Sequence, residues 1–234
     1  MSRVLVVTPT YNERDNLERF VESLHDVLPE AHVLVVDDAS PDGTGKIADR
    51  LAGRDERVSV LHRSGKLGIG SAYLEGFRHG LREGYEVLVQ MDTDLSHDPR
   101  YLPDMLAAIE RGADVVLGSR NIPGGGVDGW GPGRHFLSKG GSIYSRTILG
   151  LPLKDLTSGY KAWRREVLEA IDLGGVRSEG YSFQIEMTWR AVSRGFQVRE
   201  VPIVFVDRRA GKSKMSRQIF IEAVLMVWKL RFEG

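Results

Sequence analysis

Apolar runs along the chain alternate with segments of helical period, and turns rich in glycine, proline and polar residues separate them. Runs with β-branched residues predict strands at Arg3–Thr8, His32–Val36, Val58–Leu61, Val87–Met91 and Asp114–Gly118. Apolar residues at helical spacing predict helices around residues 17–28, 47–51, 68–81, 101–111, 134–149, 161–168, 179–187 and 218–231. This alternation predicts the α/β class, as a single domain whose mainly parallel sheet has helices on both faces.

The second half of the chain is less regular. Residues 123–133 contain six glycines and two prolines, which predicts a long irregular loop. Such a loop is typical of a lid or binding loop, and the alternative is a surface insertion. Val198–Val206 predicts a late strand, which Pro202 places near a sheet edge or a bulge.

Acidic side chains follow three of the predicted strands. Glu13 comes after the first, Asp37 and Asp38 after the second, and Asp92 and Asp94 after the strand that begins at Val87. Carboxyl ends of parallel strands share one edge, where open α/β sheets bind ligands. Two carboxylates spaced Asp-x-Asp suit a hard divalent cation, although aspartate is also a common turn residue. The pattern predicts a metal-dependent site for a nucleotide diphosphate, with the other acids binding base and ribose.

Cations gather later in the chain. Arg134, Ser138 and Lys139 lie at the start of a predicted helix, where backbone N–H groups suit a phosphate. Residues 208–217 hold five lysines and arginines. They predict a lid that closes over the phosphates, and a solvated charged loop is the alternative.

Bulk composition narrows the functional classes. The 234 residues carry a formal net charge of zero, which argues against a generic nucleic-acid binder. The absence of cysteine rules out disulfides and thiolate metal sites. The N-terminus shows no signal-peptide pattern, and no apolar run reaches the roughly 18 residues of a spanning helix.

The last segment is apolar on nearly all sides. A helix over residues 218–231 would be about 21 Å long, against roughly 30 Å of bilayer hydrocarbon, so it is too short to span. Trp228, Lys229 and Arg231 near its end suit docking on a membrane surface or on an integral-membrane partner protein. Packing on the core is the alternative. We therefore divide the chain into a domain at 1–217 and a C-terminal amphipathic helix at 218–234.

Seven motifs carry a family resemblance that spans essentially the whole chain. Three of them resemble family 2 glycosyltransferases of Rossmann-like GT-A fold: Pro9–Glu13, Val36–Thr44 and Asp92–His97. Four more resemble the polyprenol-phosphate (dolichol-phosphate) mannosyltransferases: Gly118–Arg120, Asp155–Gly159, Phe183–Met187 and Phe205–Arg208. Thr93 departs from the pattern, because the middle residue of the acidic triplet is often alanine.

The resemblance implies inverting transfer of mannose from GDP-mannose to a polyprenyl phosphate, giving polyprenyl β-mannosyl phosphate, with Mg²⁺ or Mn²⁺ as cofactor. It implies a peripheral protein at the cytoplasmic face of the membrane. The implied donor site comprises Pro9, Tyr11, Glu13, Val36 and Asp38 around the guanosine, and Asp92, Thr93, Asp94, Arg120, Arg208 and Lys214 around the metal and phosphates. Asp92 and Asp94 would bind the metal and, with Arg120, form the catalytic set. Arg120, Arg134 and Ser138 would hold the acceptor phosphate.

The expected nucleophile is a phosphate oxygen that is already anionic, so the reaction needs no general base. Asp155 is the best candidate for a base, and a turn or helix cap is its simpler role. Two alternatives stay open: a polyprenyl-phosphate glucosyltransferase that uses UDP-glucose, and a catalytically silent nucleotide-sugar-binding subunit that serves a membrane partner.

Overall fold

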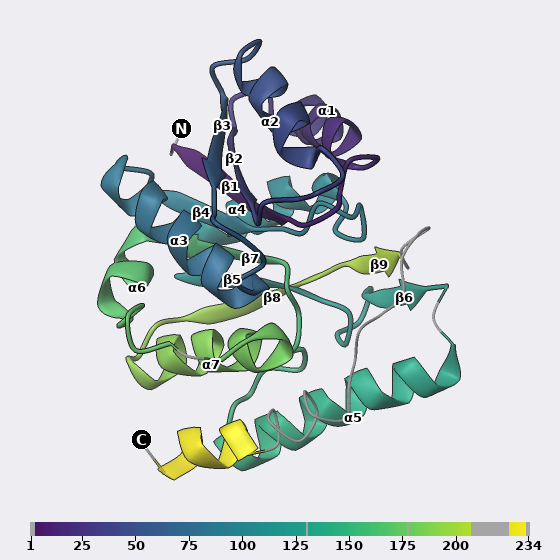
Figure 1. The fold of residues 1–234 in the computed structure, drawn as a ribbon. Helices are drawn as coiled ribbons and strands as arrows, with labels where there is room; N and C mark the ends of the chain where they lie inside the picture. Colours follow the sequence, from purple (N-terminus) through teal and green to yellow (C-terminus); the bar gives the residue numbers. More distant parts are fainter. Residues whose placement is uncertain (1–2, 130, 177, 207–224, 233–234) are drawn as a thin grey trace.

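The computed structural model describes residues 3–129, 131–176, 178–206 and 225–232, without the side chains of 132 and 134–137. Its labelled elements are β1 (Val4–Thr10), α1 (Leu17–Val27), β2 (His32–Asp37), α2 (Thr44–Ala52), β3 (Val58–His62), α3 (Ile69–Arg82), β4 (Val87–Gln90), η1 (Pro99–Tyr101), α4 (Leu102–Glu110), β5 (Val115–Ser119), β6 (Gly126–Asp128), α5 (Pro132–Leu149), β7 (Lys161–Arg164), α6 (Arg165–Ala170), α7 (Gly180–Ser193), β8 (Val198–Pro202) and β9 (Val204–Val206) (Figure 1).

Seven strands form one sheet in the order β3-β2-β1-β4-β7-β5-β8. All pairs are parallel except those of β7, which runs antiparallel to both β4 and β5. The carboxyl ends of β1, β2, β4 and β5 therefore lie at one edge, together with the amino end of β7. The predicted α/β class and mainly parallel sheet are confirmed.

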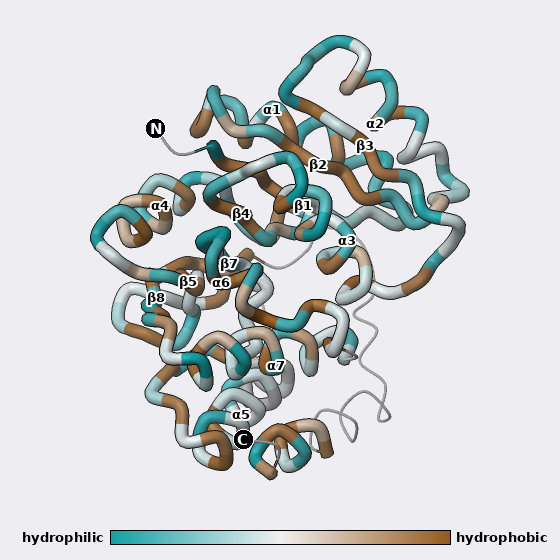
Figure 2. The backbone as a smooth tube through the Cα atoms, turned by 90° about the vertical axis from the view of Figure 1, so that its left-hand side faces the viewer, coloured by the Kyte–Doolittle hydropathy of each residue, from teal (hydrophilic) through white to brown (hydrophobic). Residues whose placement is uncertain are grey.

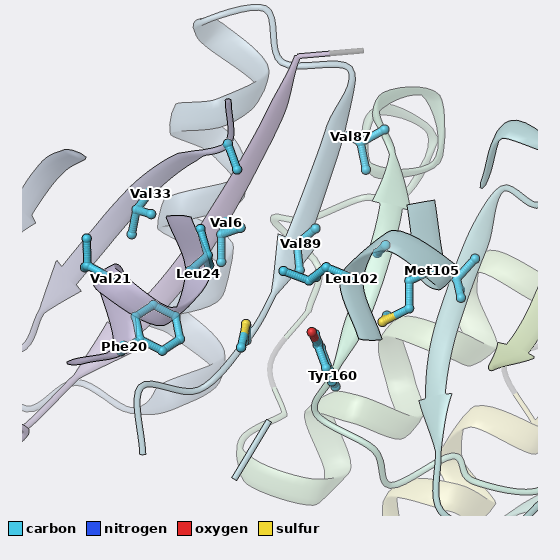
Figure 3. Close-up of a cluster of buried hydrophobic side chains, with 14 of the residues drawn as sticks. Val6, Phe20, Val21, Leu24, Val33, Val87, Val89, Leu102, Met105 and Tyr160 are labelled. Carbon is cyan, nitrogen blue, oxygen red and sulfur yellow. The ribbon is translucent and has the colours of Figure 1, made fainter. Parts of the chain in front are cut away.

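Helices cover both faces of this sheet because successive strand residues point to opposite sides. Val6 and Val89 pack with α1 and α4 in one cluster, part of which Figure 3 shows. Leu5 and Leu88, one position away in each strand, pack on the other face with α3, α6 and α7. Figure 2 shows β1, β2 and β4 as apolar stretches of the chain.

The predicted helical segment Lys161–Leu168 is wrong in its first half. Lys161–Arg164 forms the central strand β7, and helix begins only at Arg165. Both end residues of β7 are charged, which hides the strand from a reading of hydrophobic runs. Ala162 and Trp163 are fully buried between them.

Two other predicted segments also differ from the structure: the loop 123–133 contains regular elements, and the strand 198–206 is divided in two. The loop contains β6, and α5 begins already at Pro132. The late strand is split at Ile203 into β8, at the sheet edge as Pro202 predicted, and β9. β9 pairs in parallel with β6, a long-range contact that no local pattern announces.

Residues 225–232 are helical and lie beside α5, at the yellow end of the chain in Figure 1. Val227 and Leu230 are buried in a third apolar cluster with Leu149 of α5 and Ile185 of α7. Core packing thus accounts for one side of this helix. None of the helices in the described part of the chain is both long and apolar enough to cross a bilayer.

Lys161 at the start of β7 is fully buried. Its ammonium donates to the carbonyl of Gln184 at 2.7 Å and to Oγ1 of Thr188 at 2.9 Å, which anchors β7 to α7. Burial lowers the pKa of the Lys161 amine from 10.5 to about 7, although the negative charge of Asp155 opposes this shift. The amine is therefore harder to charge in the folded chain than in the unfolded one.

Replacement of Lys161 by methionine should make unfolding less dependent on pH. In the wild type the unfolded chain binds more protons between pH about 7 and about 10.5, so stability rises with pH across that window. Each unit of pKa shift corresponds to roughly 1.4 kcal/mol. In urea unfolding from pH 6 to pH 10, the free energy of unfolding of Lys161→Met should exceed that of wild type by an amount that shrinks as pH rises. The exposed control Lys139→Met should parallel wild type, and parallel profiles for both variants would contradict the burial effect.

Candidate active site

The three loops at the carboxyl ends of β1, β2 and β4 each hold a non-glycine residue with left-handed backbone. Their φ angles are +62° at Asn12, +52° at Ala39 and +61° at Leu95. Such residues cost about 1–3 kcal/mol each and cluster at ligand sites. The backbone geometry therefore points to the same edge of the sheet as the acidic motifs.

The two aspartates after β2 have different partners. Asp37 accepts hydrogen bonds from the hydroxyls of Thr10, at 2.8 Å, and Ser40, at 2.6 Å, so it holds the loop together. Asp38 pairs with the buried guanidinium of Arg63 at 2.7 Å and accepts from the backbone N–H of Leu67 at 3.0 Å. The predicted guanosine ligand Asp38 is thus a buried carboxylate whose orientation is set by the loop after β3.

Tyr11 and Glu13 lie beside this pair, in the loop after β1. The ammonium of Lys66 lies 4.1 Å from the centre of the half-buried Tyr11 ring. Glu13 accepts from the side-chain amide of Asn16 at 2.8 Å, and its backbone N–H donates to Thr44 at 3.0 Å. Of the predicted guanosine residues, Val36 differs, because its side chain is fully buried in the apolar cluster beneath α3.

The Asp-x-Asp motif directly follows β4 and is held from several sides. Tyr73 of α3 donates its hydroxyl to Asp92 Oδ1 at 2.6 Å. Thr93 is buried and contacts Thr8 of β1, with 2.6 Å between the hydroxyl oxygens. Asp94 Oδ1 accepts from the backbone N–H of Ser96 at 3.0 Å and from its hydroxyl. The two carboxylates are therefore fixed at the rim rather than displayed on a loose turn.

These two carboxylates are hard oxygen donors of the kind that Mg²⁺ and Mn²⁺ prefer. No group of three or more histidine, aspartate or glutamate side chains is gathered around a metal position in the described residues. A site built from two carboxylates and the phosphates of a substrate needs no such group. An added Cβ at Gly159 would lie 3.8 Å from Asp92 Oδ2, so the glycine leaves room beside this carboxylate.

His97 holds the backbone of Asp92 in place. Its Nδ1 accepts from the backbone N–H of Asp92 at 3.1 Å. Its ring stacks on Tyr160 at 5.0 Å and meets Phe205 edge-on at 5.5 Å. Phe205 also lies under the guanidinium of Arg120, 5.6 Å from its ring centre. These aromatic residues link the end of β4 to the end of β5.

Arg120 follows β5 and is bound by Asp155, both side chains being nearly or fully buried. Nε and Nη2 of Arg120 donate to the two carboxylate oxygens at 2.7 and 2.6 Å. Burial opposes ionisation, but the charge and hydrogen bonds of the partner outweigh it. The pKa of Asp155 is therefore lowered and that of Arg120 raised. Asp155 is thus a fixed anion that orients Arg120, which differs from the turn or cap role expected for it.

The remaining predicted phosphate-binding residues lie on two segments. Arg134 and Ser138 occupy the first two turns of α5, as predicted, although the Arg134 side chain lies outside the description. Arg208 and Lys214 lie outside the described residues.

Several contacts that shape the site were not predicted from the sequence. Arg63 and Tyr73 were not predicted as site residues, and each contacts an aspartate of the rim. His97 and Asp155 lie in predicted motifs, but their bonds to Asp92 and to Arg120, 35 positions away, were not expected. A motif read locally contains no signal for such pairs.

Comparison with known proteins identifies close relatives. The sequence model described as Glycosyl transferase family 2 matches residues 5–172. The polyprenol monophosphomannose synthase of Mycolicibacterium smegmatis is 54% identical over 232 residues, covering 98% of this chain and 88% of that protein. The undecaprenyl-phosphate mannosyltransferase of Micrococcus luteus is 52% identical over 236 residues, covering 99% and 97%.

The fold also matches solved structures. Glucosyl-3-phosphoglycerate synthase from Mycobacterium tuberculosis, in complex with Mn²⁺, uridine diphosphate and phosphoglyceric acid, has a TM-score of 0.71. The two sequences are 18% identical over 98% of this chain and 78% of that one. This likeness supports the predicted GT-A-type fold.

Removal of the Tyr73 hydroxyl should destabilise the protein more than removal of a comparable hydroxyl outside the site. Tyr73→Phe deletes a donor to a carboxylate, and such bonds contribute about 1.5–3 kcal/mol. Tyr85→Phe deletes a hydroxyl that bonds to a ring nitrogen of His32 and also interacts with the exposed Arg3 side chain, and it should cost about 0.5–1.5 kcal/mol. Urea unfolding at pH 8 compares the two variants. An equal or smaller loss for Tyr73→Phe would show that the hydroxyl does not hold Asp92.

Proposed function

Because this chain belongs to glycosyl transferase family 2, as its motifs predicted, we propose that it transfers mannose from GDP-mannose to a polyprenyl phosphate. The product is a polyprenyl β-mannosyl phosphate formed with inversion. The observation that carries this proposal is the identity of 54% and 52%, over nearly the full chain, to two proteins named for mannosyl transfer to polyprenyl phosphates.

The donor occupies the edge formed by β1, β2 and β4 in this proposal. The guanosine lies among Pro9, Tyr11, Glu13, Val36 and Asp38, where Asp38 and Glu13 offer acceptors for the N–H and O–H groups of base and ribose. Because the side chain of Val36 is buried, Val36 can contact the guanosine only through its backbone. Arg120, Arg208, Lys214 and the Thr93 backbone serve the donor phosphates.

Asp92 and Asp94 would hold Mg²⁺ or Mn²⁺, and their donor chemistry and fixed placement fit such an ion. When bound, the ion supplies positive charge to the diphosphate leaving group. The residues of the chain fix both carboxylates, through Tyr73 and Ser96, before the substrate arrives. Preorganised groups of this kind need little rearrangement during the reaction.

The acceptor phosphate lies between Arg120 and the start of α5, where Arg134 and Ser138 complete its site. Its oxygen is anionic at neutral pH and attacks the anomeric carbon of mannose without a general base. The bond between that carbon and the diphosphate breaks, and GDP leaves. Asp155, the carboxylate considered for a base role, supports this view because it is already bound by Arg120 at 2.6 Å. The positive groups therefore act by reducing repulsion between two anions.

The C-terminal helix docks the protein on the cytoplasmic face of the membrane in this proposal. Its outer side exposes Leu225, Trp228 and Phe232 at 64, 46 and 81%. Trp228 stacks on Phe232 at 5.9 Å, and the neighbouring Lys229 and Arg231 are exposed. An apolar stripe flanked by cations suits the interface of an anionic bilayer.

A transfer assay tests the function directly. Purified protein with GDP-mannose, Mn²⁺ and a short polyprenyl phosphate should give mannosyl lipid. Product from UDP-glucose but none from GDP-mannose would instead indicate the glucosyl reaction. GDP binding without turnover, even with lipid and membranes present, would indicate a silent subunit.

Asp94→Ala should abolish most of the transfer because it removes one of two carboxylates for the cation. We expect kcat/KM to fall by at least about a hundredfold, equivalent to roughly 3 kcal/mol. Mn²⁺ binding in the presence of GDP, followed by electron paramagnetic resonance, should weaken in parallel. The control Asp104→Ala removes an exposed acid on α4 and should leave both kcat/KM and Mn²⁺ binding unchanged. Near-wild-type turnover by Asp94→Ala would rule out the metal role.

Substitution of the exposed side of the C-terminal helix should weaken membrane binding without unfolding the protein. The double variant Trp228→Gln and Phe232→Gln removes exposed apolar surface while keeping the buried Val227 and Leu230. We expect affinity for vesicles with anionic phospholipid to fall about tenfold or more. Ile69→Gln, an exposed apolar residue on α3, is the matched control. Unchanged vesicle sedimentation of the double variant would contradict membrane docking by this face.

A further inference from the structure

A hydroxyl from the loop before β7 joins three elements near Arg120. Thr157 Oγ1 lies 2.9 Å from Arg120 Nη2, 3.2 Å from Asp155 Oδ1 and 3.2 Å from the hydroxyl of Ser142 on α5. Thr157 is 8% exposed and Ser142 1% exposed. Bulk water therefore does not substitute readily for these bonds.

The hydrogen-bonding capacity of a hydroxyl assigns the direction of each bond. Thr157 has one proton to donate and two lone pairs that accept. The arginine can only donate and the ionised carboxylate can only accept, so Thr157 receives from Arg120 and donates to Asp155. The remaining lone pair accepts the proton of Ser142. Thr157 is then fully satisfied, and each of its three partners is fixed relative to the others.

Ser142 lies on α5 close to Arg134 and Ser138, the residues proposed to bind the acceptor phosphate. Residues four apart on a helix lie on one face, so Ser142 shares its face with Ser138 and Arg134. The serine is thus a buried anchor one turn beyond Ser138. A second anchor holds the loop itself, because Glu200 of β8 accepts from the backbone N–H groups of Lys154 and Asp155, both at 2.9 Å.

We propose that Thr157 is a positioning residue that, with Asp155 and Ser142, fixes the spacing between Arg120 and the acceptor face of α5. This inference rests on the proposed function, because it assigns the acceptor phosphate to the gap that the link spans. Asp155 is sufficient to orient Arg120. The connection between Arg120 and α5, in contrast, passes through the Thr157 hydroxyl. The link therefore affects use of the lipid phosphate more than binding of the nucleotide.

Thr157→Val tests the link because it keeps the shape of the side chain and removes the hydroxyl. Thr157→Val loses all three bonds, but only the bond to Ser142 reaches α5. We therefore expect KM for the polyprenyl phosphate to rise about three- to tenfold, the effect of that one bond, with KM for GDP-mannose unchanged. Thr157→Ser retains the hydroxyl and should restore the wild-type acceptor KM. Ser142→Ala removes only the bond between Ser142 and Thr157, and it replaces Thr157→Val in this test if that variant does not fold. Equal changes in both KM values, or no change in either, would overturn the proposal.

A distance measurement separates this proposal from the proposed function. The chain has no cysteine, so spin labels at Lys139→Cys on α5 and Glu110→Cys at the end of α4 report the position of α5 against the sheet. Thr157→Val should broaden or shift the distance distribution, and Thr157→Ser should not. If the wild type transfers no mannose, the proposed function fails while this measurement still decides the link. An unchanged distribution in Thr157→Val would overturn it.

Discussion

The candidate site depends on fixing negative charges at one edge of the sheet. Carboxylates repel one another and the diphosphate they are proposed to serve, so each needs a partner that holds it in place. Asp38 has the buried Arg63, Asp92 has Tyr73, and Asp155 has Arg120. A buried ion pair contributes little net stability, but removal of one partner is costly. These pairs therefore act mainly to set position.

The antiparallel strand β7 makes this arrangement compact. It enters the sheet between β4 and β5, so the loop before it passes between the Asp-x-Asp motif and Arg120. Gly159 in that loop leaves room beside Asp92, and Asp155 in the same loop binds Arg120. Lys161 then ties the strand to α7 from within the core. One short segment thus connects the donor side of the site to the acceptor side.

The sequence was sufficient for the elements whose residues carry a regular apolar pattern. β1, β2 and β4, with the acids that follow them, were predicted because buried parallel strands are continuous apolar runs. β7 was missed because its end residues are charged and find their hydrogen-bond partners far along the chain; Lys161 donates to the carbonyl of Gln184 and to the hydroxyl of Thr188. The partners of Asp38 and Arg120 were missed for the same reason, since tertiary contacts 25 and 35 residues apart leave no local period. The motifs identified the acids, and only the fold shows what holds them.

The metal role of Asp92 and Asp94 can be tested by locating Mn²⁺ in a crystal of the protein grown with GDP and Mn²⁺. Anomalous scattering collected at the manganese absorption edge gives that position independently of any assay. We predict one strong peak in contact with carboxylate oxygens of Asp92 and Asp94 and with the GDP phosphates. A manganese peak elsewhere, or GDP bound away from the carboxyl ends of β1, β2 and β4, would contradict it.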